Sequence, residues 1–97
     1  MYTVKHDHRV IKHDIPKLSE TVRQRVRRAI AQKLTTHPEL YGLTLRRDLK
    51  GFRKLRVGDY RIIFRIERTT VIVLSIKHRS VVYEAILKRL SRLDRLD

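Results

Sequence analysis

The sequence predicts an α+β fold in a single domain spanning residues 1–97, with an antiparallel sheet of about four strands, two N-terminal helices and a C-terminal helix. Apolar residues recur at helical spacing between residues 19 and 34, three β-rich runs follow between residues 52 and 77, and helical spacing returns from residue 82. A chain of 97 residues can build one core, but it is too short for a second lobe or an enclosed cofactor cavity.

The N-terminal part is expected to form a strand and two helices. Residues 1–5 alternate loosely and can open the domain as a strand, and a short helix over residues 10–15 should stop at Pro16. Ser19 occupies a helix-cap position, with Glu20 in the first turn of a longer helix. The apolar face of this helix comprises Val22, Val26, Ala29, Ile30 and Leu34.

The opposite face of this helix is strongly basic. Its arginines are Arg23, Arg25, Arg27 and Arg28. A charge run of this kind is usually solvated, so we favour a solvated face over a nucleic-acid contact here.

The rest of the chain is predicted to form a loop, three strands and a helix. Residues 35–51 contain Pro38 and Gly42 and are expected to connect the elements, with a short ordered piece at 43–45. The runs 52–57, 60–66 and 71–77 are separated by turns short enough for antiparallel hairpins. From residue 82 onward, apolar residues repeat at intervals of three and four with basic residues between them, which predicts a basic amphipathic helix.

The charge balance favours a polyanionic partner. The chain has 24 Lys and Arg residues against 10 Asp and Glu residues, a formal net charge of +14. Phosphate contacts release condensed counterions, so nucleic acid is the leading candidate and a membrane the weaker one. The longest apolar run is only residues 71–74, and charged residues stand at the N-terminus in place of a signal sequence, so we expect a cytoplasmic protein that does not bind membranes. The lack of cysteine excludes disulfides and thiolate zinc sites.

Strand alternation predicts a basic face on the sheet. Alternation places Tyr60, Ile62, Phe64 and Ile66 on the core side, together with Ile72, Leu74 and Ile76. It leaves Val71, Val73 and Ser75 on the exposed side. The same exposed side is expected to gather six basic residues, Lys54, Arg56, Arg61, Arg65, Lys77 and Arg79. Like charges on adjacent strands repel, so their convergence favours a phosphate-binding role over a merely solvated face.

The same residues favour metal-independent RNA cleavage. The acidic residues are scattered singly, and His6, His8 and His13 form no convincing metal-ligand set, so we assign no metal and no cofactor. Cleavage through the 2′-hydroxyl of the RNA needs a base, a stabiliser for the phosphorane and a proton for the leaving oxygen, and basic side chains can fill each role. Lys54 can serve as the base, because neighbouring arginines disfavour its charged form.

Three sequence pieces resemble the RelE/ParE superfamily of bacterial and archaeal toxins. They begin with Leu-Lys-Gly at residues 49–51 and Arg-Val-Gly-Asp-Tyr-Arg-Ile-Ile at residues 56–63. The third piece is His-Arg-x-x-Val-Tyr at residues 78–83. The resemblance covers essentially the whole chain, and it implies a compact sheet packed by helices on one side. It also implies a toxin that enters the ribosomal A site, contacts the ribosome and its rRNA, cuts mRNA there, and is held inactive by an antitoxin.

The resemblance also implies residue roles. Lys54 looks like the base, Arg61 like the arginine that braces the scissile phosphate, and Arg79 like the arginine that supports the leaving group. Tyr83 looks like the tyrosine that stacks on a base and orients it, and His78 could share acid or base duty. The residues expected to bind RNA are Arg53, Arg56, Arg65 and Lys77. The second lysine of the best-known members is absent here, where Phe52 or Arg53 stands.

Two other functions remain open, and one partner is expected for any of them. A ParE-like toxin of the same fold would inhibit DNA gyrase by binding, without nuclease activity, and a passive RNA-binding module would neither cleave nor inhibit. Retention of Lys54, Arg61, Arg79 and Tyr83 favours cleavage. The cationic face and the apolar seam of the last helix predict a small acidic, partly disordered antitoxin as partner.

Overall fold

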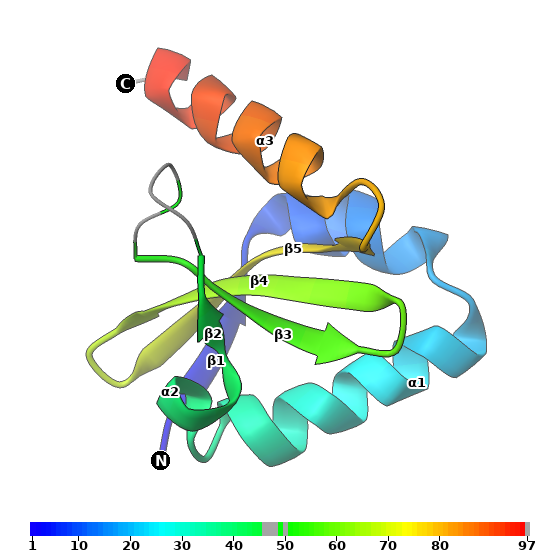
Figure 1. Cartoon of the computed structure of the whole chain (residues 1–97), viewed down its shortest axis with the longest axis vertical. Coiled ribbons are helices and arrows are strands. Elements are labelled where there is room, and N and C mark those ends of the chain that lie inside the picture. Colours follow the sequence, from blue (N-terminus) through cyan, green and yellow to red (C-terminus); the bar gives the residue numbers. More distant parts are fainter. Residues whose placement is uncertain (46–48, 50, 97) are drawn as a thin grey trace.

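The computed structural model describes residues 1–45, 49 and 51–96, and Figure 1 shows how their elements are arranged. The strands are β1 (Thr3–His6), β2 (Leu43–Thr44), β3 (Arg53–Val57), β4 (Tyr60–Glu67) and β5 (Thr70–His78). The helices are α1 (Glu20–Ala29), α2 (Pro38–Tyr41) and α3 (Val82–Leu96). Three shorter helical segments are η1 (Val10–Asp14), η2 (Ile15–Lys17) and η3 (Ile30–Leu34), the last of which continues α1. The predicted α+β class is confirmed.

The sheet has five strands in the order β1-β5-β4-β3-β2. The two predicted hairpins are confirmed, because β3 pairs antiparallel with β4 and β4 pairs antiparallel with β5. The expectation of a wholly antiparallel sheet was wrong at one edge, where β1 runs parallel to β5. The chain crosses from β1 through the helices before it returns to the sheet, and such a long connection permits parallel pairing.

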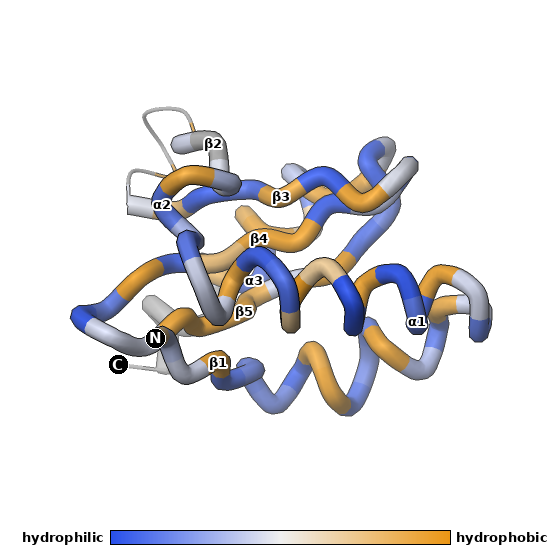
Figure 2. Tube along the Cα trace, turned by 90° about the horizontal axis from the view of Figure 1, so that it is seen from below, coloured by the Kyte–Doolittle hydropathy of each residue, from blue (hydrophilic) through white to orange (hydrophobic). Residues whose placement is uncertain are grey.

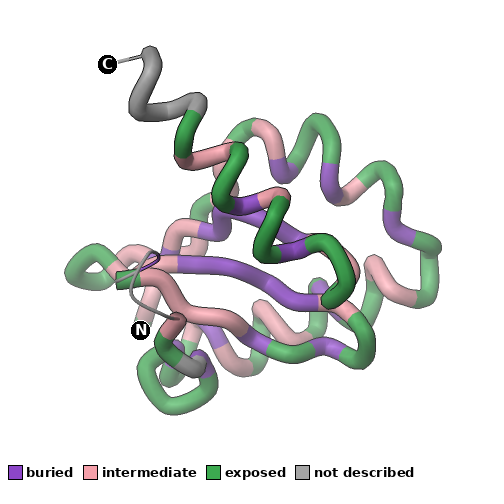
Figure 3. The backbone as a smooth tube through the Cα atoms, turned by 45° about the horizontal axis from the view of Figure 1, so that its top comes forward, coloured by how far each residue is buried: buried purple, intermediate pink, exposed green. Residues whose placement is uncertain are grey.

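Helices cover both faces of the sheet, which corrects the expectation of helices on one side only. One cluster of buried residues joins α1 and η3 to the sheet and includes Val26, Leu34, Ile62 and Phe64. A second cluster, on the other face, joins α3 to Ile63 and Leu74. Figure 1 shows α1 and α3 on opposite sides of the strands, and Figure 2 shows hydrophobic residues concentrated on the central strands. In Figure 3 the longest buried stretches follow the sheet between these two helices. We call these the α1 face and the α3 face.

A bulge in β5 corrects the predicted face of its first half. Ile63 pairs with Ser75, but the next residue, Phe64, pairs with Val73, so Leu74 is an extra residue in the ladder. Val71 and Val73, expected on the exposed side, are therefore fully buried on the α1 face. Ile72 and Leu74 pack on the α3 face. Ser75 is also fully buried.

The local signals at the helix ends are borne out in part. The Ser19 hydroxyl oxygen accepts a hydrogen bond from the Val22 N–H at 3.2 Å, which confirms the predicted cap of α1. Pro16 does not stop the first helical segment, because it lies early in η2, where a missing N–H costs nothing. The predicted loop over 35–51 contains α2 and β2, while its residues 46–48 and 50 lie outside the described part of the chain.

Gly42 is required by space at the point where the chain enters β2. Its φ is −91°, which any residue adopts, but an added Cβ would lie 2.4 Å from Phe64 Cζ and 3.0 Å from Arg53 Cβ. Gly42→Ala is therefore expected to lower the free energy of unfolding by about 1–3 kcal/mol, measured by urea denaturation. In the double variant Gly42→Ala/Phe64→Leu, the loss of unfolding free energy should be smaller than the sum of the losses in the two single variants. An unchanged denaturation midpoint for Gly42→Ala would contradict this prediction.

Candidate functional site

The side chains of Lys54 and Tyr83 meet at the edge of the α3 face. Lys54 stands opposite Ile63, which is buried beneath α3, and Tyr83 directly follows the buried Val82 at the start of that helix. The Lys54 ammonium donates a hydrogen bond to the Tyr83 hydroxyl at 2.7 Å, and Lys54 Nζ lies 5.4 Å from the centre of the tyrosine ring. Tyr83 is 38% exposed, so a ligand can reach the pair.

Arg56 and Arg61 continue the same face toward the turn between β3 and β4. They stand directly opposite each other across the two strands, and Arg56 is exposed. Arg61 is only 7% exposed, and its Nη1 donates to the carbonyl oxygens of Gly58 and Tyr60 at 2.9 and 2.8 Å. The buried guanidinium therefore both fixes the turn and adds positive charge beneath Arg56. The prediction that Lys54, Arg56 and Arg61 share one face of the sheet is confirmed here.

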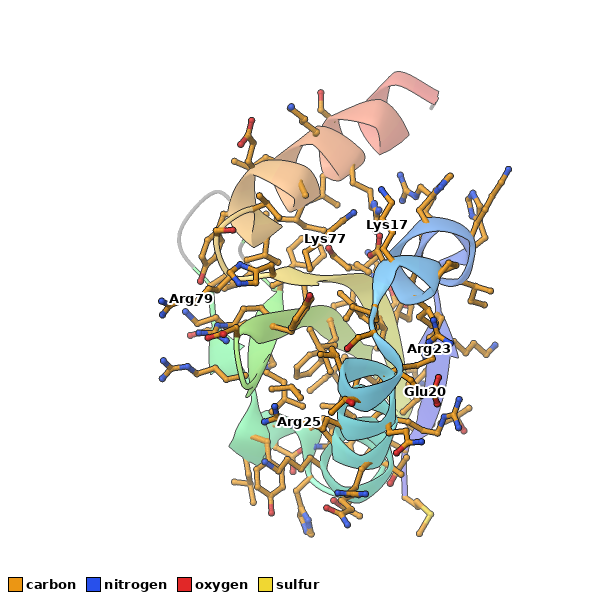
Figure 4. The ribbon with its side chains drawn as sticks, turned by 90° about the vertical axis from the view of Figure 1, so that its right-hand side faces the viewer. Lys17, Glu20, Arg23, Arg25, Lys77 and Arg79 are labelled. Carbon is orange, nitrogen blue, oxygen red and sulfur yellow. The ribbon has the colours of Figure 1, made fainter. Side chains whose placement is uncertain are left out.

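Arg79 extends the β3–β4 end of the sheet, whereas His78 lies apart from Lys54. The Arg79 N–H donates to the Asp59 carbonyl at 2.8 Å, and its side chain projects at the outer edge of the molecule in Figure 4. His78 pairs with Tyr60, and their rings meet edge to face at 5.5 Å. Because Tyr60 packs against the α1-face cluster, His78 does not join the Lys54–Tyr83 pair. Its Nδ1 lies 3.1 Å from the Ser80 backbone nitrogen and 2.8 Å from the Ser80 hydroxyl, so the ring is engaged by Ser80.

Two of the predicted RNA-binding residues are engaged elsewhere. Arg53 pairs with Phe64 and so lies on the α1 face, where its Nη1 donates to the carbonyl oxygens of Glu39 and Gly42. Arg65 shares the α3 face but forms an ion pair with Glu67 at 2.9 Å, farther along β4 than the partner of Lys54. Neither contributes to the geometry around Lys54 and Tyr83.

A buried ion cluster, which the sequence reasoning missed, fastens α3 to the sheet. Asp14 is 1% exposed, and its two carboxylate oxygens each accept a hydrogen bond from Arg89 at 3.0 Å. Lys77 Nζ lies 3.2 Å from the same carboxylate, so the third predicted RNA-binding residue is also engaged. Arg89 further donates to the Leu74 carbonyl at 2.7 Å. The available signal was an aspartate inside an apolar stretch, paired with an arginine on the apolar side of the last helix.

The charge of Asp14 is stabilised by this cluster. Burial acts to raise the pKa of the Asp14 carboxyl, but the Arg89 hydrogen bonds, the Ile76 N–H and the charges of Arg89 and Lys77 outweigh burial and lower it. The carboxylate therefore stays ionised and holds α3, and with it Tyr83, in register with β3 and β5.

A second acidic group near α3 gives the stability of the fold a dependence on pH. Hydrogen bonds from Arg9, with contact distances of 2.8 and 3.0 Å, lower the pKa of Asp7 from 3.8 to about 2. A carboxyl with a depressed pKa adds stability above its unfolded pKa and loses it as pH falls through the folded value. We expect Asp7 to contribute at most about 2 kcal/mol at neutral pH, lost mainly between pH 4 and 2. Asp7→Asn should flatten this part of the stability profile measured by urea denaturation, and an unaltered profile would contradict the prediction.

Over residues 1–45, 49 and 51–96, no three His, Cys, Asp or Glu side chains gather closely enough to hold a metal ion. Within that same part of the chain, no helix has both the length and the apolar character needed to cross a membrane.

Comparison with known proteins agrees with this architecture. Residues 3–83 match the family described as "ParE toxin of type II toxin-antitoxin system, parDE". Toxin RelG of Mycobacterium tuberculosis is 42% identical over 52 residues, which are 52% of this chain. That match covers 60% of RelG, less than two thirds of its length.

Solved structures of related toxins have the same fold. A chain of the toxin–antitoxin complex RelBE2 from Mycobacterium tuberculosis is similar with a TM-score of 0.74 and 33% identity, over 79% of this chain and 96% of that one. The isolated RelE toxin of E. coli is similar with a TM-score of 0.66 and 26% identity, over 93% of this chain and 99% of that one. The likeness therefore extends over nearly the full length of both solved chains.

Proposed function

Because this chain belongs to the ParE toxin family of type II toxin–antitoxin systems, we propose that it is a toxin that cuts mRNA on the ribosome without a metal ion. The observation that carries the proposal is the pairing of Lys54 with Tyr83 at 2.7 Å on an accessible face. Packing does not require Tyr83 there, since it is exposed and the core beside it is filled by Val82 and Ile86. The resemblance to solved RelE toxins supports the same reading.

The proposed reaction uses the 2′-hydroxyl of the RNA as its nucleophile. Lys54, in its neutral form, takes the 2′-hydroxyl proton, and the 2′-oxygen forms a bond to phosphorus. The bond from phosphorus to the 5′-oxygen breaks, and that oxygen takes up a proton from water, which leaves a cyclic phosphate and a 5′-hydroxyl. The Tyr83 ring stacks on the adjacent base and keeps the attacking oxygen near Lys54.

The charge that develops on the phosphorane is offset by the arginines at the β3–β4 end. Arg61 acts from beneath the surface, because it is 7% exposed and Nη1 is already held by two carbonyls. The exposed guanidinium of Arg56 and that of Arg79, 62% exposed, can reach phosphate oxygens directly. In this proposal Arg79 supports the leaving oxygen, and His78, on the α1 face with Tyr60, has no direct role.

An acidic antitoxin is proposed as the partner that holds the protein inactive. The solved complexes RelBE2 of Mycobacterium tuberculosis and RelBE of E. coli each contain a toxin with its antitoxin. A net charge of +14 favours an acidic partner here as well. Binding that covers Tyr83 or displaces α3 would disable the Lys54 site, because that site spans both β3 and α3.

The proposal is tested by programmed translation with the purified protein. The 5′ ends of the mRNA are mapped with ribosomes present and absent, for the wild-type chain and for Tyr83→Phe, which removes only the hydroxyl that Lys54 contacts. We expect new ends only when ribosomes are present, and fewer of them with the variant. Intact message under both conditions would contradict the proposal.

Inhibition of DNA gyrase is the second candidate, because the matching family carries the ParE name. The same protein preparation is incubated with gyrase and supercoiled DNA, and broken DNA is measured. DNA breaks together with intact message would select this function, and ribosome-dependent mRNA ends without DNA breaks would exclude it.

A further inference from the structure

A second basic surface lies where α1 meets the β3–β4 turn. A groove of about 220 Å³ opens there, and its described lining contains four basic side chains and no acidic one. The basic residues are Arg25, Arg28, Lys33 and Arg56. The groove therefore joins α1, whose arginine face was expected to be solvated, to the strand that carries Lys54.

The guanidinium groups of this groove lack acidic partners. Within the described residues, the carboxylates that form ion pairs do so with other cations, and none lies within 4.0 Å of Arg25, Arg28 or Arg56. In contrast, Arg23 on the other side of α1 pairs with Glu20. Figure 4 shows Arg25 and Arg23 on different sides of the helix, with Arg25 on the side of the β3–β4 hairpin. Uncompensated positive charge in a concave surface attracts an anionic ligand.

The β3–β4 turn holds Arg25 at close range. Gly58 has φ +60°, which favours glycine, and a Cβ added there would lie 2.9 Å from Arg25 Nη1, so a larger residue would displace this guanidinium. On the other side of the turn, Arg61 Nη1 donates to the Gly58 carbonyl at 2.9 Å. The turn is thus held between two guanidiniums, one from the groove and one from beneath the Lys54 face.

The groove and the Lys54–Tyr83 pair form a continuous cationic path. Arg56 lines the groove and follows Lys54 by two residues on the same face of β3. Two residues along a strand place their Cα atoms about 7 Å apart. The groove also offers little apolar surface for a protein helix, because Val57 is 8% exposed and Ala29 is its other apolar member. A flexible phosphate backbone fits such a surface better than an amphipathic helix does.

We propose that Arg25, Arg28, Lys33 and Arg56 bind backbone phosphates of the RNA that flanks the nucleotide cut at Lys54 and Tyr83. The inference rests on the proposed function in taking RNA as the ligand. It assigns Arg25 and Arg28 of α1 a binding role that the charge pattern alone did not favour.

The test measures binding separately from cleavage. Fluorescence anisotropy follows the full chain binding a labelled single-stranded 2′-O-methyl RNA, which lacks the nucleophile and cannot be cut by the proposed reaction. The test variant is Arg25→Gln/Arg28→Gln. The matched control, Lys17→Gln/Arg27→Gln, removes two exposed charges outside the groove.

Loss of two phosphate contacts should reduce the slope of log K against log salt by about 1.4, at about 0.7 for each contact on a single strand. We expect affinity to fall about tenfold at low salt for the test variant. The control should change the slope by less than half as much, and Arg25→Lys/Arg28→Lys should retain most of the binding because lysine also binds phosphate.

Equal slopes for the test and control variants would overturn the inference. The inference would also be overturned if the test variant lost as much affinity for a polyglutamate peptide of matched charge as for RNA. That result would indicate a general anion surface or an acidic protein partner. If the protein binds RNA through the groove but cuts none, the proposed function fails and the groove stands. If cleavage occurs and both double variants bind alike, the groove fails and the function stands.

Discussion

Replacing Lys54 with alanine is expected to lower the rate of RNA cleavage by about 10²- to 10⁴-fold, the usual contribution of a positioned proton-transfer group. The substitution removes both the proposed base and the hydrogen bond to Tyr83 at 2.7 Å. The rate is measured as the appearance of cut message in programmed translation. RNA affinity should change much less than the rate, because one of several phosphate-binding charges is lost.

Control variants separate this effect from a general loss of charge. Lys88→Ala removes another exposed lysine, which lies on α3 and pairs with Glu84, and it should leave the rate nearly unchanged. Tyr83→Phe keeps the ring for stacking and removes the hydroxyl, so it should cost less than Lys54→Ala. A Lys54→Ala protein that cuts at the wild-type rate would exclude lysine as the base.

Replacing Asp14 with alanine is expected to lower the free energy of unfolding by about 3–5 kcal/mol, the usual cost of removing one partner of a buried ion pair. The change leaves Arg89, whose side chain is 11% exposed, without its two carboxylate contacts and deprives Lys77 of its partner. It also removes the oxygen that accepts the Ile76 N–H at 2.9 Å. Urea denaturation followed by circular dichroism measures the loss.

A double-mutant cycle tests whether the ion cluster is the cause. Asp14→Ala/Arg89→Met should be less destabilised than the sum of the two single variants, since the uncompensated charge is removed together with its partner. Additive losses, or a loss below about 1 kcal/mol for Asp14→Ala, would show that the cluster does not fasten α3.

The sequence predicted correctly those features that follow from burying one side of a single strand or helix. The alternation of β3 and β4 placed Lys54, Arg56 and Arg61 on one face, and the Ser19 cap marked the start of α1. Both patterns follow from rules that act within a single element.

The errors came from contacts between elements. The side of the sheet on which α3 packs depends on the short turn after His78, and the parallel pairing of β1 depends on a crossover through several helices. The pairing of Asp14 with Lys77 and Arg89 joins residues far apart in the chain, so the sequence marks charged residues in apolar surroundings but does not say which of them pair. Burial of Arg61 against the carbonyls of its own turn also could not be inferred from alternation, which gives a direction but no depth.

The extra residue at Leu74 lets alternate residues of β5 serve one face of the sheet in its first half and the other face in its second half. Before it, Val71 and Val73 point to the α1 face, and after it Lys77 reaches the opposite face, where Asp14 receives it. A regular ladder through these same residues, without the bulge, would leave Lys77 on the face of Val71 and Val73, away from Asp14, and would turn His78 away from Tyr60. The bulge thus allows one strand to bury its valines against α1 and, farther along, to present Lys77 to the ion cluster that fastens α3.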